Sequence, residues 1–191
     1  DYQFKLPYDF YLLDSFKFSK KINHKNKFFG QDYSTTIGDR TSSKNSTKKS
    51  YSLIILNTKY QNFFFKIYKL IQGSLEKKIV VNVSCKKITK FLKSKKNYVL
   101  KPFVSEKKLL TYAKKSEYII SSGGQTMMNL VENNQFLNIY KTSNNQNFYI
   151  KQLHKYKFIN NLNFKRFCLK KNKKTGYNRI NQKNKLLKIF S

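Results

Sequence analysis

The stretch that decides the fold is Ile119-Ile120-Ser121-Ser122-Gly123-Gly124-Gln125-Thr126. Its apolar residues indicate the end of a buried strand, its glycines allow a sharp turn, and its threonine lies at the first turn of a helix whose apolar residues follow at 127–131. The free N–H groups at such a helix start, aided by the helix dipole, form an anion site suited to phosphate. A Gly-Gly turn between a strand and a helix is also common where no ligand binds, so the motif alone leaves both interpretations open.

On either side of this stretch, short apolar runs alternate with amphipathic segments. β-Branched and aromatic runs predict strands over residues 52–56, 79–83, 98–100, 118–120 and 136–140. Apolar residues spaced three and four apart predict helices over residues 63–71, 88–92, 105–113, 127–131 and 148–153, with Ser105 as a helix cap. Strands that alternate with helices are typical of βαβ units. The sequence therefore predicts an α/β fold, a Rossmann-like parallel sheet flanked by helices.

The first part of the chain has a different pattern. Residues 9–14, Asp-Phe-Tyr-Leu-Leu-Asp, predict a short buried strand, whereas residues 41–49 are polar and have no large apolar residue, which is typical of a linker. We therefore expect residues 1–47 to be the end of a preceding N-terminal domain plus a linker, and residues 48–191 to be the Rossmann-like domain. The basic tail contains enough apolar residues to predict a final helix near residues 180–189.

The charge of the chain is strongly positive. Lys and Arg number 40 and Asp and Glu number 9, which gives a formal net charge of +31. All but three of the basic residues are lysine, although nucleic-acid sites favour the planar guanidinium of arginine. Lys, Asn, Ile, Phe and Tyr all have codons rich in A and T, so a biased genome explains much of the charge. We expect a solvated lysine surface, with an RNA-binding or ribosome-associated protein as an alternative because this field attracts polyanions.

Cysteine usage and hydropathy exclude several classes of protein. Cys85 and Cys168 lie far apart without a Cys-x-x-Cys motif, so the sequence indicates neither a disulfide framework nor a zinc site. The chain contains no run near the roughly 18 apolar residues that a membrane span needs, and its start has no signal-peptide pattern. We therefore expect a cytoplasmic protein without a membrane span, a bound metal or a cofactor.

A second polar loop follows the strand predicted at residues 136–140. Its sequence is Thr142-Ser143-Asn144-Asn145-Gln146. Because consecutive strand-to-helix loops of a parallel sheet lie on the same edge, we expect the amides of Asn145 and Gln146 to face the same crevice as Gly123 and Gly124. An Asn-Gln pair is more commonly a helix cap, so this loop taken alone does not establish a ligand site.

Residues 118–126 and the pair Asn145-Gln146 together resemble the C-terminal half of a GT-B-fold nucleotide-sugar enzyme. The similarity is to the UDP-sugar hydrolase of pseudaminic acid biosynthesis, a family related to the MurG-like glycosyltransferases. Residues 29–33, Phe-Gly-Gln-Asp-Tyr, resemble the Leu-Gly-x-x-Tyr of that family, and residues 174–180, Lys-Thr-Gly-Tyr-Asn-Arg-Ile, resemble its closing Gly-x-x-Arg segment.

The resemblance implies roles for particular residues. Asn145 and Gln146 would position the sugar or phosphate, and Asn129 stands where the family has a glutamate that accepts hydrogen bonds from both ribose hydroxyls. An amide has one acceptor oxygen and no charge, so we expect weaker ribose binding, with Glu132 as a possible substitute. The residues that would surround and hold the diphosphate are Ser122, Gly123, Gly124, Gln125 and Thr126.

Two departures from the family bear on activity. Asn57-Thr58-Lys59-Tyr60 replaces the glycine-rich loop of the family, and neither His24 nor His154 matches its catalytic histidine loop, so no catalytic residue is assigned. The resemblance thus implies the nucleotide-sugar-binding half of a UDP-sugar hydrolase or a related glycosyltransferase. Its expected partners are a UDP-sugar and a missing N-terminal domain. An inactive relative that retains the fold is a further alternative.

Overall fold

The computed structural model describes residues 11–13, 27–29, 51–57, 59, 61–73 and 77–175 of the 191-residue chain. The chain divides into two compact units, Asp1–Gly38 with Tyr177–Ser191, and Asp39–Gly176. In the first unit, β1 (Tyr11–Leu13) pairs in parallel with β2 (Lys27–Phe29), and β1 lies within the strand predicted at residues 9–14. Residues 30–33, the linker at 41–49, residues 176–180 and the final helix lie outside the described residues. The domain boundary at residue 47 stays a prediction.

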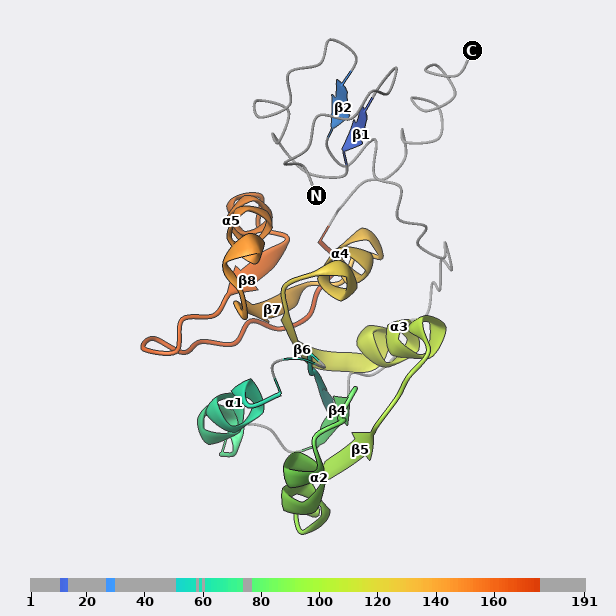
Figure 1. Ribbon diagram of the computed structural model, residues 1–191, viewed down its shortest axis with the longest axis vertical. Helices are drawn as coiled ribbons and strands as arrows, with labels where there is room; N and C mark the ends of the chain where they lie inside the picture. The colour runs from blue at the N-terminus through green and yellow to red at the C-terminus, as the bar shows by residue number, and fades with distance from the viewer. Residues whose placement is uncertain are drawn as a thin grey trace. The chain divides into compact units, whose positions relative to one another are not determined.

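The second unit contains a parallel six-stranded sheet in the order β5-β4-β3-β6-β7-β8 (Figure 1). Every neighbouring pair of strands is parallel, which confirms the predicted Rossmann-like α/β sheet. The chain first adds strands on one side of β3 and then crosses to the other side through β6. The strands are β3 (Tyr51–Ile55), β4 (Lys78–Val81), β5 (Tyr98–Lys101), β6 (Ser116–Ser122), β7 (Leu137–Tyr140) and β8 (Ile159–Asn161).

One α-helix connects each pair of successive strands in this sheet, and all five of these helices are predicted from the sequence, whereas β8, which follows the last of them, is not. The strand predicted over residues 79–83 ends at Val81, because Asn82 adopts a φ of 60° that turns the backbone out of the sheet. Ser105 occupies the N-cap position of α3 but makes no side-chain cap hydrogen bond, contrary to expectation. The helices are α1 (Phe63–Ile71), α2 (Lys86–Lys93), α3 (Glu106–Lys115), α4 (Gln125–Glu132) and α5 (Asn147–Lys155), the last preceded by the 3-10 helix η3 (Asn144–Gln146).

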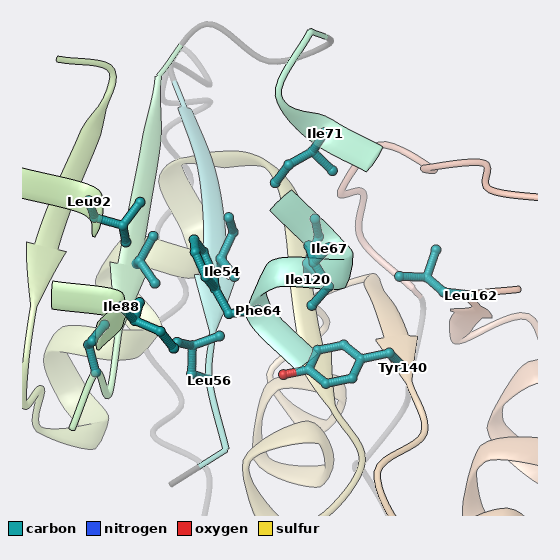
Figure 2. Close-up of a cluster of buried hydrophobic side chains, with 12 residues drawn as sticks. Ile54, Leu56, Phe64, Ile67, Ile71, Ile88, Leu92, Ile120, Tyr140 and Leu162 are labelled. Carbon is teal, nitrogen blue, oxygen red and sulfur yellow. The ribbon is translucent and has the colours of Figure 1, made fainter. Parts of the chain in front are cut away.

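The core on one face of the sheet joins α1 and α2 to alternate strand residues (Figure 2). Phe64, Ile67 and Ile71 form the buried stripe of α1, as their helical spacing predicts. Full burial of each such side chain contributes about 1.5–3 kcal/mol to stability. Figure 1 shows α3 and α4 on the opposite side of the sheet from α1, so both faces are covered. The remaining members of the cluster are Ile54, Leu56, Val80, Val83, Ile88, Leu92, Ile120, Tyr140 and Leu162.

Tyr140 brings a hydroxyl group into this apolar cluster. Its side chain is 0% exposed, its ring stacks on that of Phe63, and its hydroxyl donates a hydrogen bond to the carbonyl of Ile55 at 3.4 Å. Burial raises the pKa of Tyr140 well above its ordinary value, although hydrogen bonds from the backbone of Asn57 and the side chain of Ser122 act in the opposite direction. The neutral phenol therefore links β7 to the carboxyl ends of β3 and β6.

The contribution of Tyr140 to the free energy of unfolding should depend on pH. Tyr140→Phe should lower the free energy of unfolding by about 1 kcal/mol at pH 8, because a buried hydrogen bond is lost. The pKa of Tyr140 is higher in the folded chain than in the unfolded chain, where it is about 10. The stabilisation that Tyr140 provides is therefore complete below pH 10 and is lost as the pH rises above 10. The gap between wild type and Tyr140→Phe should therefore narrow between pH 8 and pH 11 in urea unfolding. A gap that stays constant would contradict this account.

Three buried asparagines tie the segment after β8 back to the sheet. Asn138, in β7, donates to the carbonyls of Ile119 at 3.2 Å and Lys170 at 2.9 Å. Its oxygen accepts from Asn160 at 2.9 Å and from the backbone of Lys170 at 2.8 Å. Asn172 accepts from the backbone N–H of Phe136 at 3.0 Å and donates to the carbonyl of Ala113 at 2.9 Å. Because the segment thereby covers β6 and β7, these polar groups are buried with their hydrogen bonds satisfied.

Asn172→Ala should be strongly destabilising. It removes the acceptor of the buried Phe136 N–H and the donor to Ala113, and each unsatisfied buried group costs about 1–3 kcal/mol. Chemical denaturation should show a loss of roughly 2–4 kcal/mol in the free energy of unfolding. The matched control is Asn97→Ala at an exposed turn, which should change stability by less than about 0.5 kcal/mol. Equal losses in the two variants would refute a specific role for Asn172.

Candidate functional site

The candidate site lies where the strand order reverses. β3 and β6 are neighbours, with Ile55 paired to Ser121, but β3 leads through α1 to β4 on one side whereas β6 leads through α4 to β7 on the other. Ligands of open α/β sheets bind outside the carboxyl ends of the strands at such a switch point. The stretch 119–126 therefore ends at the position where this topology places a ligand.

Gly124 has the one backbone geometry at this turn that requires a glycine. It is exposed, has φ 125° and ψ −165°, and is the N-cap of α4. A residue with a side chain rarely adopts this φ, and apart from Gly124 and its two neighbours in the chain no described atom lies within 4 Å of the position that a Cβ would take. The space beside the start of α4 is thus open at Gly124. Thr126 follows in the first turn with a half-buried side chain, whereas Ser122 precedes the glycines and is buried.

Gln146 brings the loops after β6 and β7 together. Its Nε2 donates to the carbonyl of Gly123 at 2.9 Å, and its Oε1 accepts from the N–H of Thr142 at 3.0 Å and from the hydroxyl of Thr142 at 3.2 Å. Gln146 thus lies beside Gly123, as the shared edge implies, but both ends of its amide bind protein atoms. Its role in sugar binding stays a prediction. Asn145 lies in η3, and its side chain is outside the described residues.

The contact with Gln146 explains why residue 123 has no side chain. A Cβ at Gly123 would lie 3.0 Å from both Cδ and Oε1 of Gln146. Gly123→Ala should therefore displace Gln146 and lower the free energy of unfolding by about 1–3 kcal/mol. In a Gln146→Ala background the same change should cost much less, which a double-mutant cycle followed by chemical denaturation measures. Strictly additive losses would show that the Gln146 side chain is not what Gly123 accommodates.

Three polar side chains form a row beside the start of α4. Asn129 Nδ2 donates to Oε1 of Glu106 at 2.6 Å, and Asn129 Oδ1 accepts from Nε2 of Gln125 at 3.2 Å. Gln125 directly follows Gly124, and Glu106 is the first residue of α3. Glu132 is 5% exposed in the last turn of α4, so its side chain is buried, whereas Gln125 and Glu106 are exposed. The carboxylate next to Asn129 is therefore that of Glu106, which lies at the start of the helix predicted over residues 105–113.

The helix starts make this edge of the sheet electropositive. The first turns of α1, α2, α4 and α5 contain no acidic residue, and α2 begins with Lys86 and Lys87. A helix N-terminus carries about half a positive charge, so lysines there weaken the helix slightly but strengthen the attraction for an anion. Among the described helices, only α3 begins with an acid, Glu106.

A second glutamine has the same structural role as Gln146 on the other side of β3. Gln61 is buried just before α1, where its Nε2 donates to the carbonyl of Asn82 at 2.7 Å and its Oε1 accepts from the N–H of Cys85 at 2.9 Å. It therefore holds the loop after β4 against the start of α1. Asn57 and Lys59 of the loop after β3 are described, whereas Thr58 and Tyr60 lie outside the described residues.

The described residues contain no group of three or more His, Cys, Asp or Glu side chains arranged to hold a metal ion. None of the described helices combines the length and apolar character needed to cross a membrane. Comparisons with protein-family models, with curated proteins and with solved structures found no match to this chain.

Proposed function

We propose that the carboxyl edge between β3 and β6 binds the diphosphate of a nucleotide-sugar. In this proposal the chain is the nucleotide-sugar-binding half of a UDP-sugar hydrolase or a related glycosyltransferase. The observation that carries the proposal is Gly124, which combines φ 125°, open space at its Cβ position and a place at the N-terminus of α4. This arrangement fits a ligand whose oxygen atoms approach the backbone closely.

The proposed diphosphate contacts come mainly from the backbone. The N–H groups in the first turn of α4 have no partner within the helix, and an anionic oxygen is a strong acceptor for them. The hydroxyl of Thr126 adds a donor in the same turn. The positive ends of α1, α2 and α5 favour the negative ligand further, because no acid lies in their first turns.

In the proposed reaction this unit stabilises the leaving group. Water in the hydrolase, or an acceptor hydroxyl in the transferase, attacks the anomeric carbon of the sugar. The bond from that carbon to the diphosphate oxygen breaks, and UDP leaves with the bonding electron pair. N–H donors fixed around the diphosphate stabilise the negative charge that develops on it. The base that removes the proton from the nucleophile would come from the N-terminal domain that the proposal requires.

UDP binding to the full chain tests the proposal. UDP at a hundredfold excess over its Kd should stabilise the chain by about 2.7 kcal/mol, which is measurable as a rise in Tm. Thr126→Val preserves the side-chain shape but removes the hydroxyl, and should weaken UDP binding roughly tenfold, equivalent to a hydrogen bond to a charged group. Thr111→Val is the matched control, because the Thr111 hydroxyl bonds to the carbonyl of Lys107 on the exposed side of α3.

A second pair of variants tests the backbone approach. Gly124→Val should abolish the UDP-dependent shift in Tm by filling the open space, whereas Gly73→Val, also with open space at its Cβ position, should leave the shift unchanged. The Tm of each variant without ligand separates lost binding from the backbone strain at Gly124. A wild-type chain whose Tm does not change at millimolar UDP would contradict the proposed function.

A further inference from the structure

Aromatic side chains join α1 to α2 at the outer side of the hydrophobic core. The ring of Phe91 in α2 meets the rings of two α1 residues edge to face, with centroids 5.5 Å apart for Phe65 and 4.8 Å apart for Tyr68. All three side chains are half-buried, whereas Ile88 and Leu92 of α2 are buried in the core. Phe65, Tyr68 and Phe91, here called the aromatic seam, are therefore partly accessible to a ligand.

Two lysines place their ammonium groups against the aromatic seam. Lys87 Nζ lies 5.7 Å from the centroid of the Phe65 ring, and Lys95 Nζ lies 5.3 Å from that of the Phe91 ring. Attraction to the rings keeps the positive charge beside them. The other lysines of α1 and α2 are also exposed, and they are Lys66, Lys69, Lys86, Lys90 and Lys93. The two helices thus combine positive charge with accessible aromatic rings.

The charge in this half of the sheet domain has one sign. The described residues from 51 to 105 include no Asp or Glu. The acids in the rest of the described chain are Glu106, Glu117 and Glu132. A biased genome accounts for the number of lysines, but it does not account for their position over rings that join two helices. The surface of α1 and α2 is complementary in charge to a polyanion.

We infer that the aromatic seam and its lysines bind single-stranded nucleic acid without sequence preference. Proteins of this class combine a basic surface along the phosphate backbone with aromatic side chains on which bases stack. Lysine suffices for the phosphates, which it contacts as a point charge, whereas the reading of base edges favours arginine. The chain has only three arginines, at positions 40, 166 and 179, which fits binding that is not sequence-specific.

The half-burial of the rings favours nucleic acid over a membrane surface. A stacked base needs one accessible ring face, whereas an interfacial helix inserts its apolar face about 5–10 Å into the lipid. The apolar face of α2 is instead buried in the core through Ile88 and Leu92. A lipid surface would therefore meet the lysines of α2 without reaching its apolar residues.

The aromatic seam is distinct from the carboxyl edge at which a diphosphate is proposed to bind. Figure 1 shows α4, which begins beside Gly124, on the opposite side of the sheet from α1. The inference therefore does not rest on the proposed function, and either can fail without the other. An excess of UDP should leave the binding of a nucleic acid at the aromatic seam unchanged.

Fluorescence anisotropy of the full chain with a labelled oligouridine of about 12 nucleotides tests the inference. Competition against this probe should show that unlabelled oligouridine binds more tightly than inorganic polyphosphate of the same length, which has charge but no bases. Phe91→Leu preserves an apolar side chain between the helices but removes a stacking surface. It should weaken oligouridine binding about fivefold to a hundredfold and leave polyphosphate binding unchanged.

The matched control for Phe91→Leu is Tyr156→Leu. Tyr156 is an exposed aromatic residue that lies between Lys155 and Lys157 at the end of α5, so its local composition is similar. This variant should change the affinity for oligouridine by less than about twofold, because its ring lies outside the aromatic seam. Equal losses in the two variants would contradict a specific role for the seam.

A pair of double variants tests the position of the charge. Lys87→Gln with Lys95→Gln should weaken binding and reduce the slope of log affinity against log salt by about 0.7 for each phosphate contact that is lost. Lys107→Gln with Lys108→Gln makes the same change in net charge at exposed positions of α3, and should leave the slope nearly unchanged. The Tm of each variant establishes that it is folded under the conditions of the assay.

Several results would overturn the inference. Polyphosphate that binds as tightly as oligouridine, or equal losses in the two double variants, would reduce the binding to general charge attraction. Polyglutamate that competes as well as oligouridine of the same charge would show that this surface takes an acidic protein instead. Displacement of oligouridine by UDP would place its binding at the carboxyl edge.

Discussion

The positive φ of Gly124 is the constraint on which the candidate site depends. β6 is buried at its carboxyl end, and two residues separate it from α4. Only a residue without a side chain takes φ 125° easily, so this turn positions the start of α4 directly at the end of β6. Gly123 meets a different demand, because Gln146 packs against it. Gly124 thus provides the backbone conformation of the turn, and Gly123 provides the space that the Gln146 side chain occupies.

At the carboxyl edge of the sheet, the positions of the charges matter more than their total number. Four of the described helices begin without an acidic residue, so their positive ends are not neutralised locally. α3 differs, since Glu106 lies in its first turn and is held by Asn129. The described part of this edge therefore combines several positive helix ends with one carboxylate, and it is not uniformly basic. A uniformly basic edge would suit polyanions of any kind.

Most strands and helices could be predicted from the sequence, because their buried positions produce apolar runs or regularly spaced apolar residues. Strands β3 and β6 appear as apolar runs, and α1 appears as apolar residues at helical spacing. β8 could not be recognised, since Ile159 is its only apolar residue and its other two residues are asparagines. The buried Asn138 and Asn172 likewise resemble surface residues in sequence, although their amides hold the last described segment in place.

In the candidate site, too, features formed by residues close in sequence could be predicted, whereas contacts between distant residues could not. The turn at Gly123 and Gly124 was predictable because strand, glycines and helix follow one another in sequence. The joining roles of Gln61 and Gln146, and the contact of Glu106 with Asn129, depend on residues that are distant along the chain. A glutamine in a polar loop has the same local sequence whether it faces water or an adjacent loop. Only the topology, which places successive loops on one edge, brings these side chains together.

Some of the many lysines also have a structural role, because they contact aromatic rings. Five described lysines place their ammonium groups over aromatic rings at 5.1–5.7 Å, among them Lys87 over Phe65 and Lys95 over Phe91. Each such contact contributes about 0.5–1 kcal/mol at an exposed site, comparable to a surface ion pair. Because acids are scarce, aromatic rings take the place of carboxylates as partners. Lysines held in this way contribute to the general electrostatic field, whereas the binding proposed at the carboxyl edge depends on fixed N–H donors.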